Sequence, residues 1–334
     1  MAGIKDVAQF AGVSTSTVSR VMSGKNNVSE ETSSKVHKAA HILNYTPNML
    51  AKSLKIGRTD TIALLVPSIE NPIFPVITRG AEDTARKNGF MTILCNTDFD
   101  NEIEKSYINN LRTRWIDGVI LCTMMTESSH IKKLRESDFP VVLTLRHYDN
   151  TVDAVVIDNY QAAYDGTSYL ISTGHKRIAI AIRRRDVNIY RERFDGYLAA
   201  LREGGLTFDE SLVMEEISGT NDFKHLTKRL LSSGKNPDAI FATSDPMAVV
   251  ILRALKDNGV RIPEDISVLG IDNIEIASLI EPPLSTLSQP LYDIGAIAAQ
   301  KLISLILHKE KFGQLPPPTV DILSADLIIR KSTR

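Results

Sequence analysis

The chain has 334 residues, of which 43% are hydrophobic and 24% are charged, and its formal net charge is −1. This length and composition suit two or more folded domains and exclude a disordered, collagen-like or coiled-coil chain. No apolar run approaches the roughly 18 residues of a membrane span, and the N-terminus lacks the apolar region of a secretory signal. We therefore expect a cytoplasmic protein without a membrane partner.

The first part of the chain predicts three short helices, the first two joined by a sharp turn. Over residues 4–11, apolar residues recur at the i, i+3, i+4 and i+7 spacing of one helix face, and Gly12 then gives access to φ > 0. Residues 15–22 predict a second helix, and a third is expected to start with Ser29 as its N-cap and to end near Asn44. This order is a helix-turn-helix pattern.

The second helix combines hydroxyl side chains with one guanidinium group. Hydroxyls compete for the backbone's own hydrogen bonds, so helix stability does not explain them. A helix that recognises base edges and phosphates in a DNA major groove requires such groups on its exposed face. The alternative is an ordinary exposed helix of a small helical domain. The residues are Ser14, Thr15, Ser16, Thr17, Ser19 and Arg20.

Charge is distributed unevenly along the chain. Residues 1–59 contain eight Lys/Arg and three Asp/Glu, a net charge of +5, whereas residues 60–334 contain 31 and 37, a net charge of −6. A basic segment suits nucleic acid because neutralising phosphates supplies much of the affinity. Charge and helix pattern together favour double-stranded DNA as a partner.

From residue 61 onward, apolar strands alternate with amphipathic helices. Strands that are apolar along their whole length indicate parallel sheets buried on both faces. The 275 residues after position 59 exceed one comfortable core, so we expect two Rossmann-like lobes. Strands are expected over residues 61–67, 90–96, 118–122, 140–145, 154–158, 177–182, 239–243 and 267–272, and helices over 76–88, 160–173, 190–203 and 246–258.

Two acids, Asp158 and Asp272, close apolar strands of this body. Open α/β sheets bind ligands beyond the carboxyl ends of their strands, and carboxylates there suit the hydroxyls of a sugar or the amines of a base. Acid–base catalysis would need partner residues that the sequence does not place, so binding is the better interpretation.

Motifs of catalysis and metal binding are missing from the sequence. It contains no GxxxxGK[ST], GxSxG or HExxH motif and no paired Cys/His spacing, so we predict no catalytic residue, metal site or cofactor. His175 follows a helix-ending glycine and is interpreted as a structural loop residue. Cys95 and Cys122 end apolar strands and are interpreted as reduced core thiols.

The stretch IKDVAQFAGVSTSTVSRVMSG, the later NYTPNMLAKSLK and the layout of the remaining chain resemble the lactose/galactose-repressor (LacI/GalR) family of bacterial transcription regulators. The resemblance implies an all-α helix-turn-helix head with a hinge helix and a periplasmic-binding-protein-like α/β body, whose two lobes of Rossmann-like parallel sheets exchange strands. The implied boundaries are residues 1–46 for the DNA-binding domain, 47–59 for the hinge helix and linker, and 60–334 for the ligand-binding and dimerisation body, with crossovers near 158–161, 288–290 and 323–325.

The resemblance also implies which residues of the head contact DNA. Thr15, Ser16 and Arg20 are expected to read bases. Ser14 and Thr17 are expected to hold phosphates.

The hinge helix, expected over residues 48–56, is implied to lie in the DNA minor groove. Leu54 matches the family's leucine, which wedges between the central base pairs and kinks them. Lys52 stands where many members carry arginine, so a phosphate contact is expected there.

For the body, the resemblance implies a small-molecule effector in the cleft between the lobes. Arg193 matches the family's ligand-clamping arginine, and Asp158 and Asp272 match its two acids. Phe74 matches an aromatic wall position, and Ser244 matches a position that is often asparagine.

Several departures from the family bear on the effector. Ile73 stands where some members place a second aromatic residue, and Asn221 stands where an aromatic residue often stacks on a sugar or base. Arg183, Arg184 and Arg185 replace a Gly/Pro-rich loop at the carboxyl end of a strand. If one or two of these groups face the cleft, an anionic effector such as a sugar phosphate or sugar acid is favoured. The alternative is that all three are solvated and interact only with the acidic surface of the body.

These expectations describe a nucleoid-associated, ligand-responsive repressor that acts as a homodimer on a near-palindromic operator, with a neutral or anionic sugar-like effector. The chain lacks the leucine heptads that some members append for tetramer formation. One alternative is a catabolite-control-type regulator that responds to a phosphorylated carrier protein, although Ala298 occupies the place of a characteristic arginine. A solute-binding protein of transport and an enzyme are remoter alternatives. The effector's identity, its inducing or co-repressing sense, the operator and the regulated genes are not predicted.

Overall fold

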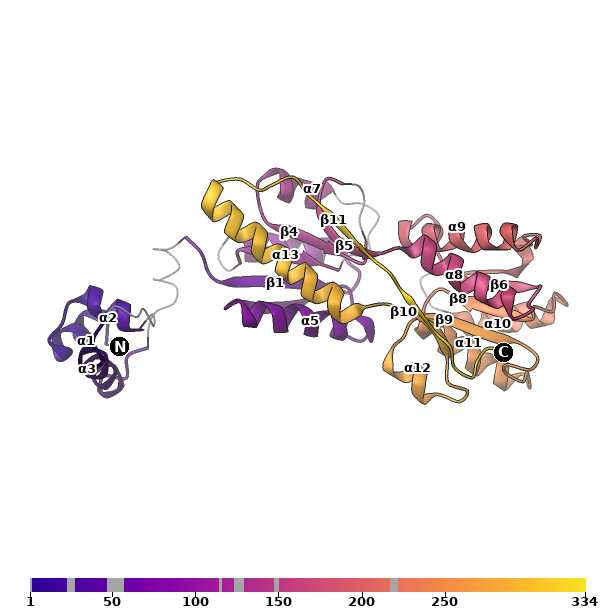
Figure 1. Ribbon diagram of the computed structural model, residues 1–334, viewed down its shortest axis with the longest axis horizontal. Coiled ribbons are helices and arrows are strands. Elements are labelled where there is room, and N and C mark those ends of the chain that lie inside the picture. The colour runs from indigo at the N-terminus through magenta and orange to yellow at the C-terminus, as the bar shows by residue number, and fades with distance from the viewer. Residues whose placement is uncertain are drawn as a thin grey trace. The chain divides into compact units, whose positions relative to one another are not determined.

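The computed structural model describes residues 2–22, 28–46, 57–113, 116–122, 129–146, 150–216 and 222–334. The chain divides into two compact units, Met1–Thr59 and Asp60–Arg334. The first unit is the helical head. The second is the body, which contains two sheets (Figure 1). We call the lobe around the first sheet the N-lobe and the lobe around the second sheet the C-lobe.

Three helices form the head: α1 (Ile4–Ala11), α2 (Thr15–Met22) and α3 (Glu30–Ile42). Gly12 ends α1 with φ 67°, a left-handed conformation that glycine adopts at no steric cost. Ser29 caps α3, because its side chain accepts a hydrogen bond from the backbone N–H three residues on. The predicted helix-turn-helix is therefore confirmed. Its core consists of Val7, Ala8, Val18, Val21, Val36, Ala39 and Ala40.

The N-lobe is built on a parallel sheet of strand order β11-β5-β4-β3-β1-β2. Alternate residues of β1 belong to two separate core clusters, so this strand is buried on both faces. Helices α5 and α13 contribute to one cluster, and α6 and α7 contribute to the other. The elements are β1 (Thr61–Val66), α5 (Ile73–Lys87), β2 (Met91–Asn96), α6 (Asn101–Arg112), β3 (Gly118–Leu121), α7 (Ser129–Glu136), β4 (Val141–Thr144), β5 (Asp153–Ile157), α13 (Leu291–Phe312) and β11 (Val320–Leu323).

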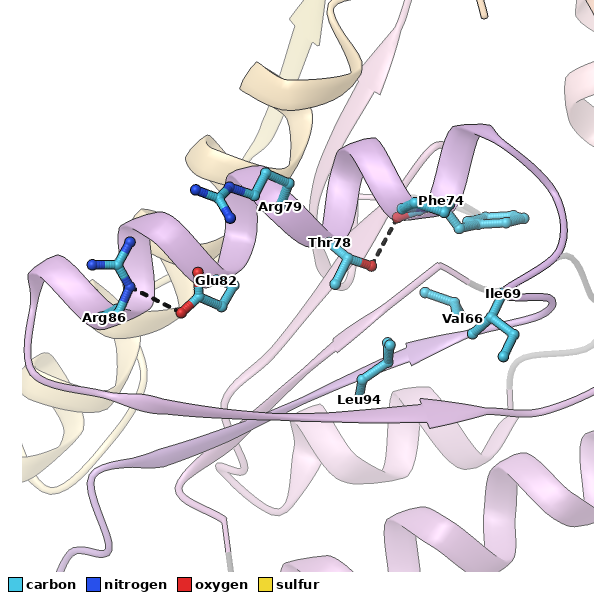
Figure 2. A pocket seen from close by; sticks show the side chains of 9 residues that line it. Val66, Ile69, Phe74, Thr78, Arg79, Glu82, Arg86 and Leu94 are labelled. Carbon is cyan, nitrogen blue, oxygen red and sulfur yellow. Dashed lines mark hydrogen bonds and ion pairs between the residues drawn. The ribbon is translucent and has the colours of Figure 1, made fainter. Parts of the chain in front are cut away.

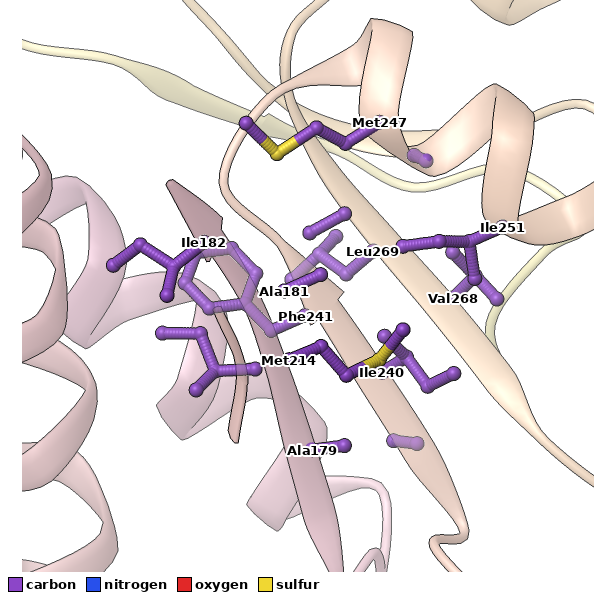
Figure 3. Packing of buried hydrophobic residues seen from close by; sticks show 14 of the residues in the cluster. Ala179, Ala181, Ile182, Met214, Ile240, Phe241, Met247, Ile251, Val268 and Leu269 are labelled. Carbon is purple, nitrogen blue, oxygen red and sulfur yellow. The ribbon is translucent and has the colours of Figure 1, made fainter. Parts of the chain in front are cut away.

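The C-lobe sheet has the order β12-β10-β9-β8-β6-β7, parallel except for the antiparallel pair β10 and β12. Figure 3 shows aliphatic and aromatic side chains of β6, β8 and β9 packing with those of α11 in its core. The elements are α8 (Asn159–Ser172), β6 (Ile178–Arg183), α9 (Asn188–Glu203), the 3-10 turn Glu210–Leu212, β7 (Val213–Glu216), α10 (Phe223–Ser232), β8 (Ala239–Ala242), α11 (Asp245–Asp257), β9 (Ser267–Asp272), α12 (Glu275–Leu279), β10 (Ser285–Ser288) and β12 (Asp326–Ile328).

Three segments connect the lobes. Strand β5 lies in the N-lobe sheet and leads into α8, which packs on α9 of the C-lobe. Strand β10 lies in the C-lobe sheet and leads into α13, which packs on α5 of the N-lobe. Strand β11 belongs to the first sheet and β12 to the second. The backbone N–H of Asp158 donates to the carbonyl oxygen of Leu323 at 3.0 Å, so the first and third connections lie side by side.

The expected fold class, a helical head followed by an α/β body of two lobes, is confirmed. The uniformly apolar runs predicted eight of the strands but not β7, β10, β11 and β12, which have three or four residues each. Strand β7 also carries two acids, and β11 and β12 are partly exposed, so an apolar run does not mark them.

Helix α13 is long and apolar enough to cross a membrane by length and composition, but 50% of its apolar window is buried inside the protein. It lies along α5 (Figure 1). A Cβ atom at Gly80 would lie 2.0 Å from the carbonyl oxygen of Tyr292, and one at Gly295 would lie 2.0 Å from that of Ile77. Glycine at both positions is what lets the two helix backbones approach each other.

We predict that Gly80→Ala destabilises the body. In an open helix this change stabilises by about 1 kcal/mol. Here the new methyl group meets the backbone of α13, and separating the helices should lower the free energy of unfolding by about 1–3 kcal/mol. Urea unfolding followed by circular dichroism measures the difference. Lys87→Ala, at the exposed end of α5, is the control and should change stability by less than about 0.5 kcal/mol. A neutral or stabilising Gly80→Ala would contradict the close packing.

Candidate functional site

One face of α2 presents the polar residues that the sequence singled out. Ser14, Thr15, Ser16 and Arg20 are exposed, and Thr17 is half-buried. The opposite face is buried against the other two helices of the head. The structure therefore brings these five side chains to one accessible surface.

Hydroxyl groups form a hydrogen-bonded cluster at the start of α2. The Oγ of Ser14 lies 2.7 Å from the Oγ of Ser16 and 2.9 Å from the Oγ1 of Thr17. It also accepts a hydrogen bond from the backbone N–H of Thr17 at 3.1 Å, so it caps the helix. Hydroxyls at a helix N-terminus, where the helix dipole is positive, suit an anionic oxygen such as that of a phosphate.

Two predicted DNA-binding residues of the hinge, Lys52 and Leu54, lie outside the described residues. The same holds for Asn221 in the body.

In the body, Arg193 on α9 is a buried cation with 3% of its surface exposed. Its Nε donates to the Oδ1 of Asn159 at 2.9 Å, and a terminal nitrogen donates to the carbonyl oxygen of Thr243 at 2.5 Å. Burial lowers the pKa of Arg193, and the negative charge of Asp272 opposes this shift. A buried guanidinium is costly unless it is hydrogen-bonded, so its place in the fold is closely defined.

Asp272, at the carboxyl end of β9, is also 3% exposed. Its Oδ1 accepts a hydrogen bond from the Nε2 of Gln289 at 2.5 Å, and its Oδ2 accepts one from the backbone N–H of Asp245 at 3.3 Å. The φ angle of Asp272 is 131°, in a region that non-glycine residues seldom occupy. Such backbone conformations concentrate at functional sites, where surrounding structure holds them in place.

A second carboxyl group, that of Asp245 at the start of α11, lies fully buried beside Asp272. It accepts hydrogen bonds from the Oγ1 of Thr286 at 2.6 Å and from the backbone N–H of Ile274 at 3.0 Å. A Cβ atom at Gly270 would lie 2.2 Å from its Oδ1, so β9 leaves room for this carboxyl group only because residue 270 is glycine.

Burial raises the pKa of both carboxyl groups, of Asp272 to about 7 and of Asp245 to about 6. The charge of Asp245 raises the pKa of Asp272 further, whereas the guanidinium of Arg193 lowers it. Two carboxyl groups that are close together and buried resist being ionised at the same time, so the pair retains a proton near neutral pH.

The other predicted ligand residues occupy different surroundings. Ser244 precedes α11 as its N-cap residue and is half-buried. Asp158 is exposed, and its side chain caps α8 by accepting the backbone N–H of Gln161. Phe74 is 1% exposed and packs in the core cluster of the N-lobe. The electrostatic interaction between Arg193 and Asp272 thus places these two groups in one polar region of the C-lobe, whereas the Phe74 side chain lies among apolar residues of the N-lobe.

Of the three consecutive arginines, Arg183 ends β6 and the next two follow it. The pairing of Arg184 and Arg185 differs from the expectation of a cluster beside the ligand. Arg184 pairs with Asp186 at 2.5 Å. Arg185 pairs with Glu215 at 2.8 Å and with Glu210 at 3.0 Å. For these two arginines the alternative expectation, pairing with surface acids, describes the structure: Arg184 finds its partner in the same loop, and Arg185 finds its partners on and before β7.

A pocket of about 640 Å³ lies in the N-lobe between α5 and strands β1 and β2 (Figure 2). Val66, Ile69 and Leu94 form an apolar side of it, while Arg79, Glu82 and Arg86 extend along α5 on the other side. Leu94 is 46% exposed and Ile69 is 56% exposed. Strand β2 is the edge of its sheet, so this pocket opens on an apolar sheet edge.

Ala298, the position that the resemblance compared with a characteristic arginine, has no exposed surface. It faces the N-lobe core from α13. This position therefore offers nothing to a partner protein.

Sequence reasoning did not identify Asn159, Thr243, Asp245, Gln289 or Thr286 as part of the buried polar region. Asn159 and Asp245 each follow a residue that was predicted, and Gln289 precedes the proline that caps α13 at its N-terminus. The sequence feature that could have indicated these residues is that they are polar and lie at strand ends and at lobe connections. Their hydrogen bonds join residues distant in sequence, which a single sequence does not show.

Comparison with known proteins places the whole chain among bacterial regulators. Residues 3–48 match the family of bacterial regulatory proteins named after lacI, and residues 59–319 match the family of periplasmic binding proteins and sugar binding domain of LacI family. The HTH-type transcriptional regulator RegA of Clostridium saccharobutylicum is 38% identical over 99% of this chain and 98% of its own.

Two solved structures share the fold along the full chain. The transcriptional regulator CelR in complex with cellobiose is 30% identical, with a TM-score of 0.74 over 99% of this chain and 100% of that chain. The lac repressor dimer bound to operator and the anti-inducer ONPF is 25% identical, with a TM-score of 0.86 over 99% of each chain. These similar proteins are regulators and not enzymes.

We predict that Asp272→Asn gains stability relative to the parent protein as the pH rises. A carboxyl group whose pKa is raised by folding stabilises the folded state at low pH, and this stability is lost as the pH rises through the folded-state pKa, about 7 for Asp272. Asparagine does not titrate. The difference in free energy of unfolding should therefore shift in favour of the variant by about 1–3 kcal/mol between pH 5 and pH 8. Urea titrations at several pH values measure it, and a constant difference would contradict the raised pKa.

Proposed function

This chain belongs to the LacI family of bacterial transcription regulators, and we propose that it is a cytoplasmic, nucleoid-associated repressor that binds a near-palindromic operator as a homodimer and responds to a sugar or sugar derivative. The observation that carries the DNA-binding part is the face of α2 on which Arg20 and the hydroxyls of Ser14, Thr15, Ser16 and Thr17 are accessible together. The net charge of +5 on residues 1–59 supports it, because a basic head is attracted to phosphates. Lys52 and Leu54 complete the proposed contacts in the minor groove.

The effector is proposed to bind at the C-lobe region of Arg193 and Asp272, with Ser244, Asp158 and Phe74 as further contacts. Buried carboxyl, amide and guanidinium groups offer the hydrogen-bond acceptors and donors that sugar hydroxyls need. The complex of the relative CelR with cellobiose supports a sugar. We favour a neutral sugar over an anionic one, because Arg184 and Arg185 are paired with acids of the body.

The homodimer is proposed to form through the N-lobe pocket and the edge strand β2. Met91 and Leu94 on this strand are 62% and 46% exposed, and Ile69 beside the pocket is 56% exposed. An apolar sheet edge favours association with another copy unless it is covered. A two-fold dimer would bury the same patch of both chains and present two heads to the two halves of an operator.

Selection of binding sites from random duplex DNA with the full chain tests the function. Enrichment of a near-palindromic site is expected, and its affinity should fall steeply with salt. Adding sugars, with cellobiose and ribose among them, should change the affinity for that site at least about tenfold for the effector, which corresponds to about 1.4 kcal/mol of differential binding. Failure to enrich any duplex site would refute the proposal.

Arg20→Ala should relax specificity at one base position in each half-site. An arginine that donates to a base edge contributes about 1–3 kcal/mol of discrimination there. Binding to the selected site and to its single-base variants, measured by fluorescence anisotropy, gives the change. Lys38→Ala, which removes an exposed positive charge from α3, is the control and should weaken binding equally for all sequences, if at all. An equal loss on every sequence for Arg20→Ala would mean that Arg20 contacts phosphate alone.

Leu94→Arg should weaken the dimer. It places a charge in the apolar sheet edge, where association would have to desolvate it twice, once in each copy. Sedimentation velocity should show a dissociation constant raised at least about a hundredfold, equivalent to about 2.7 kcal/mol. Leu307→Arg, a matched change at a 46% exposed position on α13, should leave the dimer intact. An unchanged dimer in the Leu94 variant would place the interface elsewhere.

A further inference from the structure

The segments that connect the lobes carry two buried amide side chains. Asn159 lies two residues after the end of β5, begins α8 at the first connection and is 3% exposed. Gln289 follows β10 directly at the second connection and is 6% exposed. Asn159 accepts a hydrogen bond from Arg193, and Gln289 donates one to Asp272; these are the two charged groups of the proposed effector site.

At the first connection, the amide oxygen of Asn159 accepts the Nε–H of Arg193 at 2.9 Å. Its Nδ2 donates to the carbonyl oxygen of Ile157 at 3.3 Å, within β5 of the N-lobe sheet. The second bond fixes which end of the amide faces the guanidinium. The Arg193 side chain of the C-lobe is thus attached through one residue to the last residue of an N-lobe strand.

At the second connection, the Nε2 of Gln289 donates to the Oδ1 of Asp272 at 2.5 Å. Its Oε1 is buried and has no hydrogen-bond partner among the described residues. Since the Oε1 end contributes no bond there, the contact with Asp272 is what orients this amide. Two residues further on, Leu291 begins α13, whose buried side chains belong to the N-lobe core.

Rotation of one lobe against the other has to take place in the connections, because both sheets are packed on their two faces. An amide attached to a connection either breaks its hydrogen bond to a buried charge during such a motion or carries the charged group with it. Hydrogen bonds to buried charged groups are among the strongest in proteins, and losing one leaves a charge unsatisfied. Both outcomes link the lobe angle to the geometry of the site.

We propose that Asn159 and Gln289 are positioning residues that couple the angle between the lobes to the placement of Arg193 and Asp272. This inference rests on the proposed effector site. It assigns the coupling to two amides, one on the first connection and one on the second. A bound sugar that draws Arg193 towards itself then pulls on the first connection, and one that draws Asp272 pulls on the second. A change of lobe angle alters the affinity for the sugar, as linkage requires.

Gln289→Met tests the second contact, since it keeps the length of the side chain and removes the amide. Loss of the Nε2–H donor should move the titration midpoint of Asp272 upward by about half a pH unit or more, because that donor favours the ionised carboxylate. Carbon-13 NMR of labelled aspartate in the full chain measures the midpoint. The groups that also act on Asp272 are Asp245 on α11 and Arg193 on α9, and neither is altered.

Gln161→Met is the matched control for this measurement. Gln161 lies beside the first connection, is exposed and donates to the surface carboxylate of Asp165 at 2.7 Å. The midpoint of Asp272 should stay unchanged in this variant. If Gln289 only stabilised the fold, its replacement would lower the free energy of unfolding without moving the midpoint of Asp272. The midpoint therefore distinguishes a positioning role from a purely stabilising one.

Asn159→Ala tests the first contact, with Asn188→Ala on α9 as its control. Amide hydrogen exchange by mass spectrometry should become at least about fivefold faster across residues 158–161 and at the amides of residues 288, 289 and 291 in Asn159→Ala and in Gln289→Met, but not in the controls. The NMR signal of the Arg193 Nε–H should also exchange faster in Asn159→Ala.

An unchanged Asp272 midpoint in Gln289→Met, or unchanged exchange at both connections in the two variants, would overturn the coupling. None of these measurements uses an effector or DNA. Their failure is therefore distinct from a failure of the operator selection or of the sugar panel, which would refute the proposed function and leave the coupling measurement intact.

Discussion

The C-lobe depends on the burial of three charged or chargeable groups among hydrogen-bond partners from many elements. Removing a charge from water costs several kcal/mol unless other groups replace its hydration. Arg193 is satisfied by Asn159 and Thr243, and Asp272 by Gln289 and by the backbone of Asp245. The charged groups lie on α9, β9 and α11, and their other partners lie in the loop before α11 and on the first and second lobe connections. Displacing any one of these elements would leave a buried polar group unsatisfied, so the network holds them together.

The N-lobe depends on elements that are distant in sequence from the rest of the lobe. Its sheet needs β11 and its core needs α13, and both elements come from the last fifty residues of the chain. Helix α13 packs closely against α5 because Gly80 and Gly295 let the two helix backbones contact each other. Neither lobe is therefore a continuous stretch of sequence. Folding has to bring together segments that are separated by an entire lobe, a topology with many non-local contacts that slows folding.

The sequence was most informative where a single element carries the signal. Period and capping predicted the helices of the head, and uniformly apolar runs predicted the strands that are buried on both faces. The family resemblance pointed to Arg193 and Asp272, which the structure buries in one polar region. The resemblance did not indicate Asn159 or Gln289, because their role comes from hydrogen bonds across lobe connections. Arg185 was interpreted without its partners: Glu210 and Glu215 lie about one helix further along the chain, and only the sheet register brings β7 beside β6.

The raised pKa values bear on how a sugar would be recognised at this site. A hydroxyl that donates to Asp272 favours the ionised carboxylate, so its binding lowers the pKa that burial and the charge of Asp245 raise. Removal of the Gln289 donor would raise the pKa of Asp272, whereas approach of Arg193 would lower it. Gln289 on a lobe connection and Arg193 on α9 therefore act on the same equilibrium in the same direction, because both favour the ionised carboxylate of Asp272. Under the proposed function, lobe angle, proton and sugar are linked through one carboxyl group.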